Sequence, residues 1–169
     1  MDEFAKHEIF WVTRCIALGG YPLDDDMPLL RKGGITHLFN LDLPYANAAE
    51  IAQLGFEVVS FPITDGRKMP DEKALACLNR FHGILSQEGT GVFIHCQAGI
   101  NRSPTVLWLY LVANGLGLDG AGEQIAKVSP HAVPGDPALC DRRLLDLILA
   151  HGRAHFIPHP RPEALLPPG

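Results

Sequence analysis

The chain has 169 residues, of which 47% are hydrophobic and 20% charged, so it can form one domain with a buried core and is not a disordered chain. The net charge of −5 disfavours a broad nucleic-acid-binding surface, and no apolar run reaches the about 18 residues of a membrane span. The N-terminus lacks the apolar core of a signal peptide, and the four cysteines show no close pairing. We therefore expect a cytoplasmic protein with free thiols, no membrane association and no nucleic-acid partner.

The hydrophobic pattern predicts strands that alternate with helices. Strands are expected at FWVT (10–13), IALGG (16–20), 35–41, 56–63 and 91–95. Helices are expected at 28–32, at 46–54, from Asp71 onward, and at 102–113, 119–128 and 137–150. This alternation is typical of an α/β domain in which helices flank a mostly parallel, twisted sheet.

The chain is predicted to contain one domain, residues 1–157, followed by a proline-rich C-terminal tail, residues 158–169. Proline cannot continue a helix, so the tail is expected to be extended. It either lies on the domain or is loosely held.

One segment, from His95 to Ser103, places a cysteine at the end of a buried strand and an arginine at the start of an apolar helix. A turn from strand to helix directs backbone N–H groups and the helix dipole into one concavity, which suits an oxyanion. Gly99 permits a backbone conformation that residues with a Cβ rarely adopt, and Arg102 offers a planar fork for two phosphate oxygens. A Cys96 thiolate in this concavity would be a nucleophile for phosphoryl transfer. The alternative, a buried structural cysteine, is disfavoured by the length of the combined pattern.

The segment resembles the H-C-x5-R-[ST] signature of the cysteine-dependent protein tyrosine phosphatases, and the small size of the chain resembles their dual-specificity branch. GGYP (19–22), GGITHLFNL (33–41) and FPITD (61–65) resemble the early strands and the acid loop of that family. The resemblance covers roughly residues 9–150. It implies the dual-specificity phosphatase fold and hydrolysis of phosphotyrosine, and of phosphoserine or phosphothreonine, in a protein or peptide substrate. It implies no cofactor and no metal.

The resemblance also implies roles for individual residues. Cys96 would attack phosphorus and form a phosphocysteine, Arg102 would hold the phosphoryl group, and Ser103 would help the thiolate to leave. The phosphate loop would consist of Gln97, Ala98, Gly99, Ile100, Asn101 and Arg102. His95 would support the loop by hydrogen bonding rather than act in the chemistry. Asn40 would brace the loop, with ordinary strand-end hydrogen bonding as the alternative.

Hydrolysis of a serine or tyrosine phosphate also needs an acid for the leaving oxygen. Asp65 follows an apolar strand end, and one helix and one strand separate it from Cys96. Neighbouring parallel strands joined by a helix bring their C-terminal ends together, so Asp65 is the expected acid. The alternative for Asp65 is a turn-forming Asp-Gly pair. Asp42 and Asp71 are the next carboxylates to consider.

Three other functions remain open at this point. Asn101-Arg102 resembles the RNA 5′-triphosphatase relatives, although Asp65 and Ser103 favour a phosphoester with a poor leaving group. A phosphate-binding pseudophosphatase scaffold is disfavoured because the nucleophile and the arginine are present. A rhodanese-type sulfur transferase is disfavoured by the C-x5-R-S spacing. The absence of lysine from the phosphate loop disfavours an inositol lipid as substrate.

The remaining reactive side chains have simpler interpretations. Asp24, Asp25 and Asp26 could suggest a metal site, but a solvated turn or a helix cap is expected. The eight histidines show no zinc-ligand spacing. The three cysteines outside the signature are expected in the core: Cys15, Cys77 and Cys140.

Overall fold

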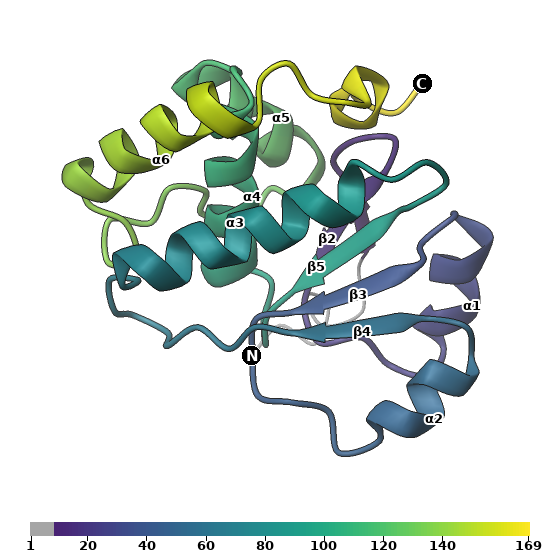
Figure 1. Ribbon diagram of the computed structural model, residues 1–169. Helices are drawn as coiled ribbons and strands as arrows, with labels where there is room; N and C mark the ends of the chain where they lie inside the picture. Colours follow the sequence, from purple (N-terminus) through teal and green to yellow (C-terminus); the bar gives the residue numbers. More distant parts are fainter. Residues whose placement is uncertain (1–8) are drawn as a thin grey trace.

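Five short strands form one sheet in a computed structural model that describes residues 9–169 (Figure 1). They are β1 (Ile9–Trp11), β2 (Ile16–Gly19), β3 (His37–Asn40), β4 (Glu57–Ser60) and β5 (Val92–His95). Their spatial order is β1-β2-β5-β3-β4, and only the edge strand β1 is antiparallel to its neighbour. The predicted α/β architecture with a mostly parallel sheet is confirmed. The first eight residues, which the prediction included in the domain, lie outside the described residues.

Helices cover both faces of the sheet, which explains why the inner strands β2 and β5 are almost entirely apolar rather than alternating. In β5, Val92 and Ile94 belong to one hydrophobic cluster, whereas Phe93 belongs to the other. In β3, Phe39 belongs to the same cluster as Ile94, and Leu38 belongs to the same cluster as Phe93. Successive side chains of a strand point to opposite faces, so each strand contributes to two separate cores.

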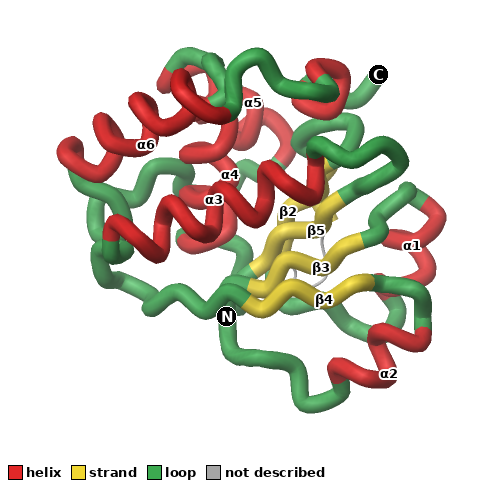
Figure 2. Tube along the Cα trace, in the orientation of Figure 1, coloured by secondary structure: helices red, strands yellow, loops and turns green. Residues whose placement is uncertain are grey.

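Six helices cover these two faces (Figures 1 and 2). They are α1 (Asp26–Lys32), α2 (Ala48–Gln53), α3 (Asp71–Leu85), α4 (Arg102–Ala113), α5 (Leu118–Val128) and α6 (Arg142–His155). The short helices α1 and α2 pack on one face, and α3 to α6 pack on the other (Figure 1). Helix α4 is buried along almost its whole length because α5 and α6 pack on it from outside. None of the helices within residues 9–169 is long and apolar enough to cross a membrane.

The predicted helix 137–150 was wrong at both ends, since α6 spans Arg142–His155. The helix begins there because the side chain of Asp141 accepts a hydrogen bond of 2.8 Å from the backbone N–H of Leu144, which caps the first turn. The preceding residues form a turn in which the N–H groups of Leu139 and Cys140 donate to the carbonyl of Asp136. An N-cap aspartate was thus counted as an interior helical residue.

The C-terminal segment 158–169 lies on the domain and contains one 3-10 turn, Pro162–Leu165. Its Arg161 is buried and donates to the carbonyls of Leu85 and Gln87, at 2.9 and 2.7 Å, where α3 ends. The N–H of Arg14 donates to the carbonyl of Leu166 at 2.9 Å. This segment therefore joins the C-terminal end of α3 to the β1–β2 turn.

Candidate active site

The signature segment lies at the C-terminal edge of the parallel strands (Figure 1). Cys96 directly follows β5, the middle strand of the sheet, and Arg102 is the first residue of α4. Loops that follow β3 and β4 reach the same edge and bring two carboxylates, Asp42 and Asp65, to Arg102. Binding sites of open α/β sheets form at this edge, where adjacent strands connect to different helices.

The Cys96 thiol is buried at the base of the loop. Its Sγ lies 3.3 Å from the backbone nitrogen of Gly99, which donates to it, and 3.3 Å from the Oγ of Ser103. The Ser103 hydroxyl also lies 3.3 Å from the carbonyl of Gly19. One hydroxyl proton cannot serve both acceptors, so ionisation of Cys96 would turn the Ser103 proton toward sulfur. The start of α4 adds partial positive charge beside the sulfur.

Glycine is required where the loop packs against the end of β2. Gly99 has a φ of +73°, and a Cβ there would lie 2.6 Å from the carbonyl carbon of Gly19 and 2.7 Å from the nitrogen of Gly20. A Cβ on Gly20 would in turn lie 2.9 Å from the carbonyl oxygen of Gln97. The two backbones can approach this closely only without side chains. This contact determines the shape of the phosphate loop.

Arg102 is held by groups that follow β3 and β4. Its Nη1 donates to Oδ1 of Asp42 at 3.0 Å and to the carbonyl of Ile63 at 3.2 Å. The side chains of Arg102 and Asp42 are 10% and 20% exposed, so this ion pair is largely shielded from water. Two fixed acceptors keep the guanidinium plane of Arg102 in one orientation.

Asp65, the predicted acid, lies at the mouth of the site. Its Oδ1 is 3.8 Å from the Nε of Arg102, and its side chain is 62% exposed. Asp65 and Arg102 line a common cavity of about 370 Å³ together with Asp42 and Lys73. Asp65 is therefore an exposed carboxyl group beside Arg102, at the same cavity.

The structure separates the two other carboxylates that the sequence suggested as acids. Asp71 forms an ion pair with Arg143 at 2.6 Å, in a different part of the surface. Asp42 is instead in the site, as the closest ion-pair partner of Arg102. Sequence reasoning missed this positioning role because 60 residues separate the two side chains. The only feature of the sequence that pointed to this role was the position of Asp42 just after a buried strand.

His95 supports the loop from beneath. Its ring bonds the hydroxyl of Tyr45 through Nε2 and the carbonyl of Cys96, 3.1 Å away, through Nδ1. Burial lowers the pKa of His95 to about 4, so the ring is neutral at physiological pH. Tyr45, whose pKa burial raises, was not singled out from the sequence. A neutral imidazole between two such partners positions the backbone at Cys96.

The hydrogen bonds of Asn40 differ from the predicted brace on the phosphate loop. Its Nδ2 donates to the carbonyl of Leu43 at 2.8 Å, and its Oδ1 accepts from the N–H of Asp42 at 2.8 Å. These are the strand-end bonds considered as the alternative. They shape the turn that carries Asp42 to Arg102, and the backbone of Asn40 pairs with that of His95 in the sheet.

Other reactive side chains lie away from this site. Asp26 accepts a hydrogen bond from the N–H of Leu23 at 2.7 Å, which closes the turn before α1. Cys77 and Cys140 are buried and Cys15 is half-buried, and all are free thiols. Across residues 9–169, no group of three or more His, Cys, Asp or Glu side chains could hold a metal ion.

A family model for the catalytic domain of dual specificity phosphatases matches residues 16–139, which include the whole segment from Cys96 to Ser103. The chain belongs to the dual specificity phosphatase family. The probable protein tyrosine phosphatase type IVA A of Dictyostelium discoideum is 31% identical to it over 106 residues, 56% of this chain and 60% of the relative. Dual specificity protein phosphatase 12 of Rattus norvegicus is 29% identical over 119 residues, 68% of this chain and 34% of the relative. The match thus spans less than two thirds of either relative's length.

Solved structures agree with the dual specificity phosphatase fold. The crystal structure of PTPMT1 in complex with PI(5)P has a TM-score of 0.72 and 19% sequence identity, covering 86% of this chain and 97% of the other. A variant of TpbA from P. aeruginosa in complex with pTyr has a TM-score of 0.68 and 16% identity, covering 90% and 99%. At these identities the likeness establishes the fold of the dual specificity phosphatase domain.

Proposed function

We propose that this protein is a phosphomonoester hydrolase that removes phosphate from phosphotyrosine, and from phosphoserine or phosphothreonine, in protein substrates through a phosphocysteine. The observation that carries the proposal is the arrangement of Cys96, whose buried sulfur lies under the Gly99 N–H and the Ser103 hydroxyl, at the start of the helix that begins with Arg102. A nucleophile, an oxyanion cradle and a bidentate cation are the groups that phosphoryl transfer requires.

In the first step, the Cys96 thiolate attacks phosphorus and the bond from phosphorus to the leaving oxygen breaks. Arg102 and the backbone N–H groups of the loop stabilise the charge on the phosphoryl oxygens. Asp65 transfers its proton to the leaving oxygen, which departs as the free tyrosine or serine hydroxyl. The position of Asp65 beside Arg102, in the same cavity, supports this role.

In the second step, water attacks the phosphocysteine and the ionised Asp65 accepts a proton from it. The bond between sulfur and phosphorus breaks, inorganic phosphate leaves, and Cys96 returns as the thiolate. The Ser103 hydroxyl, 3.3 Å from Sγ, donates a hydrogen bond to the sulfur as its negative charge develops. This chemistry requires a reduced cysteine, so we also propose a reducing compartment such as the cytoplasm.

The proposal is tested with the variant Cys96→Ser, which retains the shape of the loop but replaces the thiolate by a poor nucleophile. We expect wild-type protein to hydrolyse p-nitrophenyl phosphate and phosphotyrosine peptides, and the variant to bind a phosphopeptide without turnover. Cys77→Ser is the matched control, because Cys77 is buried in the core and should affect stability only. Normal turnover by Cys96→Ser would refute the proposal.

Substrate class is tested in parallel with phosphopeptides and RNA that carries a 5′-triphosphate. A protein phosphatase should hydrolyse the peptides at the higher kcat/KM. Preference for the RNA would assign the triphosphatase reaction instead, while leaving Cys96 and Arg102 in their roles. Peptide binding without any turnover by wild-type protein would indicate a scaffold.

A further inference from the structure

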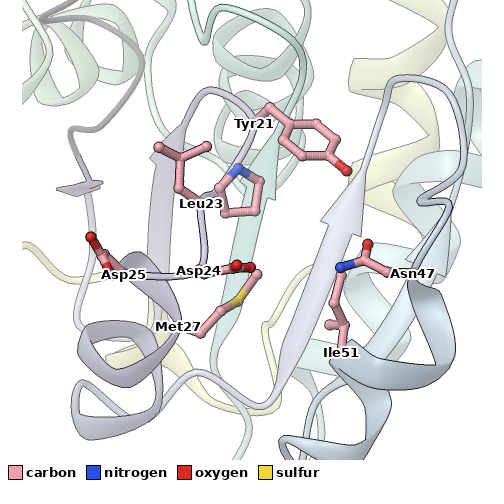
Figure 3. Close-up of a pocket in the computed structure, with 8 residues that line it drawn as sticks. Tyr21, Leu23, Asp24, Asp25, Met27, Asn47 and Ile51 are labelled. Carbon is pink, nitrogen blue, oxygen red and sulfur yellow. The ribbon is translucent and has the colours of Figure 1, made fainter.

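A cavity of about 440 Å³ lies beside the phosphate loop, between the chain that follows β2 and the start of α2 (Figure 3). Its lining consists of Tyr21, Pro22, Leu23, Asp24, Asp25, Met27, Asn47 and Ile51. None of these residues takes part in the chemistry described above. The volume lies in the range of small-ligand sites and is large enough for one long side chain.

The cavity combines an apolar floor with a negatively charged rim. Met27 and Ile51 are buried at its base, and the ring of Tyr21 stands over one side (Figure 3). Asp24 and Asp25 are exposed, and neither forms an ion pair with any Lys or Arg of residues 9–169. Asp25 is the N-cap residue of α1, but its side chain forms no capping hydrogen bond, so its carboxylate is available to a ligand.

Tyr21 connects this cavity to the phosphate loop. Its backbone N–H donates to the carbonyl of Gln97 at 3.0 Å. Its ring meets the ring of Tyr45 edge-on at 5.3 Å between centroids and that of His95 at 5.8 Å. Burial and the nearby Asp42 carboxylate raise the pKa of Tyr21. Tyr21 thus places the cavity next to the phosphate loop, so the substrate side chains that it can accept are those near the phosphorylated residue.

We propose that this cavity binds a lysine or arginine side chain of the substrate, within three residues of the phosphorylated residue. The inference rests on the proposed phosphoprotein phosphatase function and adds a sequence preference to it. The methylene stem of the cation packs on Met27, Ile51 and the Tyr21 ring, while its charged head meets Asp24 and Asp25. An apolar floor with an unpaired acidic rim fits a long cationic side chain better than an apolar or an anionic one.

The test compares kcat/KM for phosphotyrosine peptides that differ only in carrying Lys, Gln or Glu at one position, from three residues before to three residues after the phosphotyrosine. With wild-type protein we expect kcat/KM of the Lys peptide to exceed that of the Gln peptide by about threefold to tenfold. This preference should occur at one or more positions on one side of the phosphotyrosine and has the size expected for partly exposed ion pairs. The preference should decline between 0.05 and 0.5 M salt.

The double variant Asp24→Asn/Asp25→Asn should reduce the ratio of kcat/KM for Lys peptides to kcat/KM for Gln peptides to near one. The double variant Asp24→Lys/Asp25→Lys should reverse the preference, so that Glu peptides have the highest kcat/KM. The matched control is Glu88→Gln/Asp146→Asn, which removes the same charge from exposed positions on other parts of the surface and should keep the wild-type ratio. Reversal is a readout that a merely structural role of Asp24 and Asp25 would not produce.

Equal kcat/KM for Lys and Gln peptides at every position would overturn this inference but not the proposed function. The same conclusion would follow if the control variant changed the Lys-to-Gln ratio of kcat/KM as much as the Asp24 and Asp25 variants do. If wild-type protein turns over p-nitrophenyl phosphate but no phosphopeptide, the proposed function itself fails and the inference with it. The two failures are therefore distinguishable.

Discussion

Removal of the Asp42 carboxylate tests how far the orientation of Arg102 determines catalysis. The pair is joined at 3.0 Å and both side chains are largely buried, so Asp42→Ala removes one charge-assisted hydrogen bond and leaves the carbonyl of Ile63 as the nearest acceptor for Nη1. Such a bond contributes about 1.5–3 kcal/mol. If this energy is lost from the transition state, kcat falls by about 10- to 150-fold.

Asp42→Asn keeps an acceptor atom at the same place and loses only the charge, so its kcat should lie between those of Asp42→Ala and the wild type. The assay is steady-state hydrolysis of p-nitrophenyl phosphate, whose leaving group is a good anion, and of a phosphotyrosine peptide. A positioning residue acts on phosphoryl-group contacts alone, so both substrates should lose the same factor. The matched control is Asp71→Ala, which breaks the exposed pair with Arg143 and should leave kcat unchanged.

Two results would refute this reasoning. A loss below about threefold in Asp42→Ala would show that the pair does not orient Arg102. A much larger loss on the phosphotyrosine peptide than on p-nitrophenyl phosphate would show that Asp42 donates the proton to the leaving oxygen, in place of Asp65.

Asp65→Asn should lower kcat on a phosphotyrosine peptide by about 10²–10⁴-fold and on p-nitrophenyl phosphate by much less, since only the first leaving group needs a proton. An equal fold decrease on both substrates would place the acid elsewhere. Burial lowers the pKa of His95 to about 4, so below pH 6.5 the unfolded chain binds a proton that the folded chain excludes. As the pH falls from 6 to 4.5, the free energy of unfolding should therefore decrease by about 1 kcal/mol per pH unit because of this group. Urea unfolding of His95→Gln, measured at several pH values, should show a smaller dependence of that free energy on pH. Arg161→Ala removes a buried guanidinium from the carbonyls at the end of α3 and should cost about 2–4 kcal/mol in urea unfolding, whereas Arg80→Ala, at an exposed position of α3, should cost little.

Helix boundaries show where sequence patterns succeeded and where they stopped. The predicted helix 102–113 agrees with α4, because a continuous apolar run between the signature and Asn114 leaves no competing start or end. The predicted helix 137–150 was misplaced because apolar residues on both sides of Asp141 have a spacing that is compatible with one continuous helix, whereas α6 begins only after Asp141. Whether an aspartate caps a helix depends on the backbone conformation before it, which the turn at Asp136 establishes.

The acid site shows the same limit at longer range. Asp65 was placed near the signature from the topology of neighbouring parallel strands, and it does lie beside Arg102. Asp42 and Asp71 were equivalent alternatives in the sequence. Only the order of the strands separates them, because β3 lies next to β5 and its C-terminal end brings Asp42 to Arg102, whereas Asp71 begins a helix that turns away toward Arg143.

Hydrophobic periodicity and a contiguous signature depend on residues that are neighbours along the chain, so the order of the amino acids was enough to predict the α/β class and the phosphate loop. The pairs that hold the loop in place, such as Asp42 with Arg102 and Tyr45 with His95, and the contact of Arg161 with the end of α3, became visible only in the folded chain. These partners are at least 50 residues apart in the sequence. Their meeting depends on strand order and helix packing, which the burial of two separate cores selects for the whole chain at once.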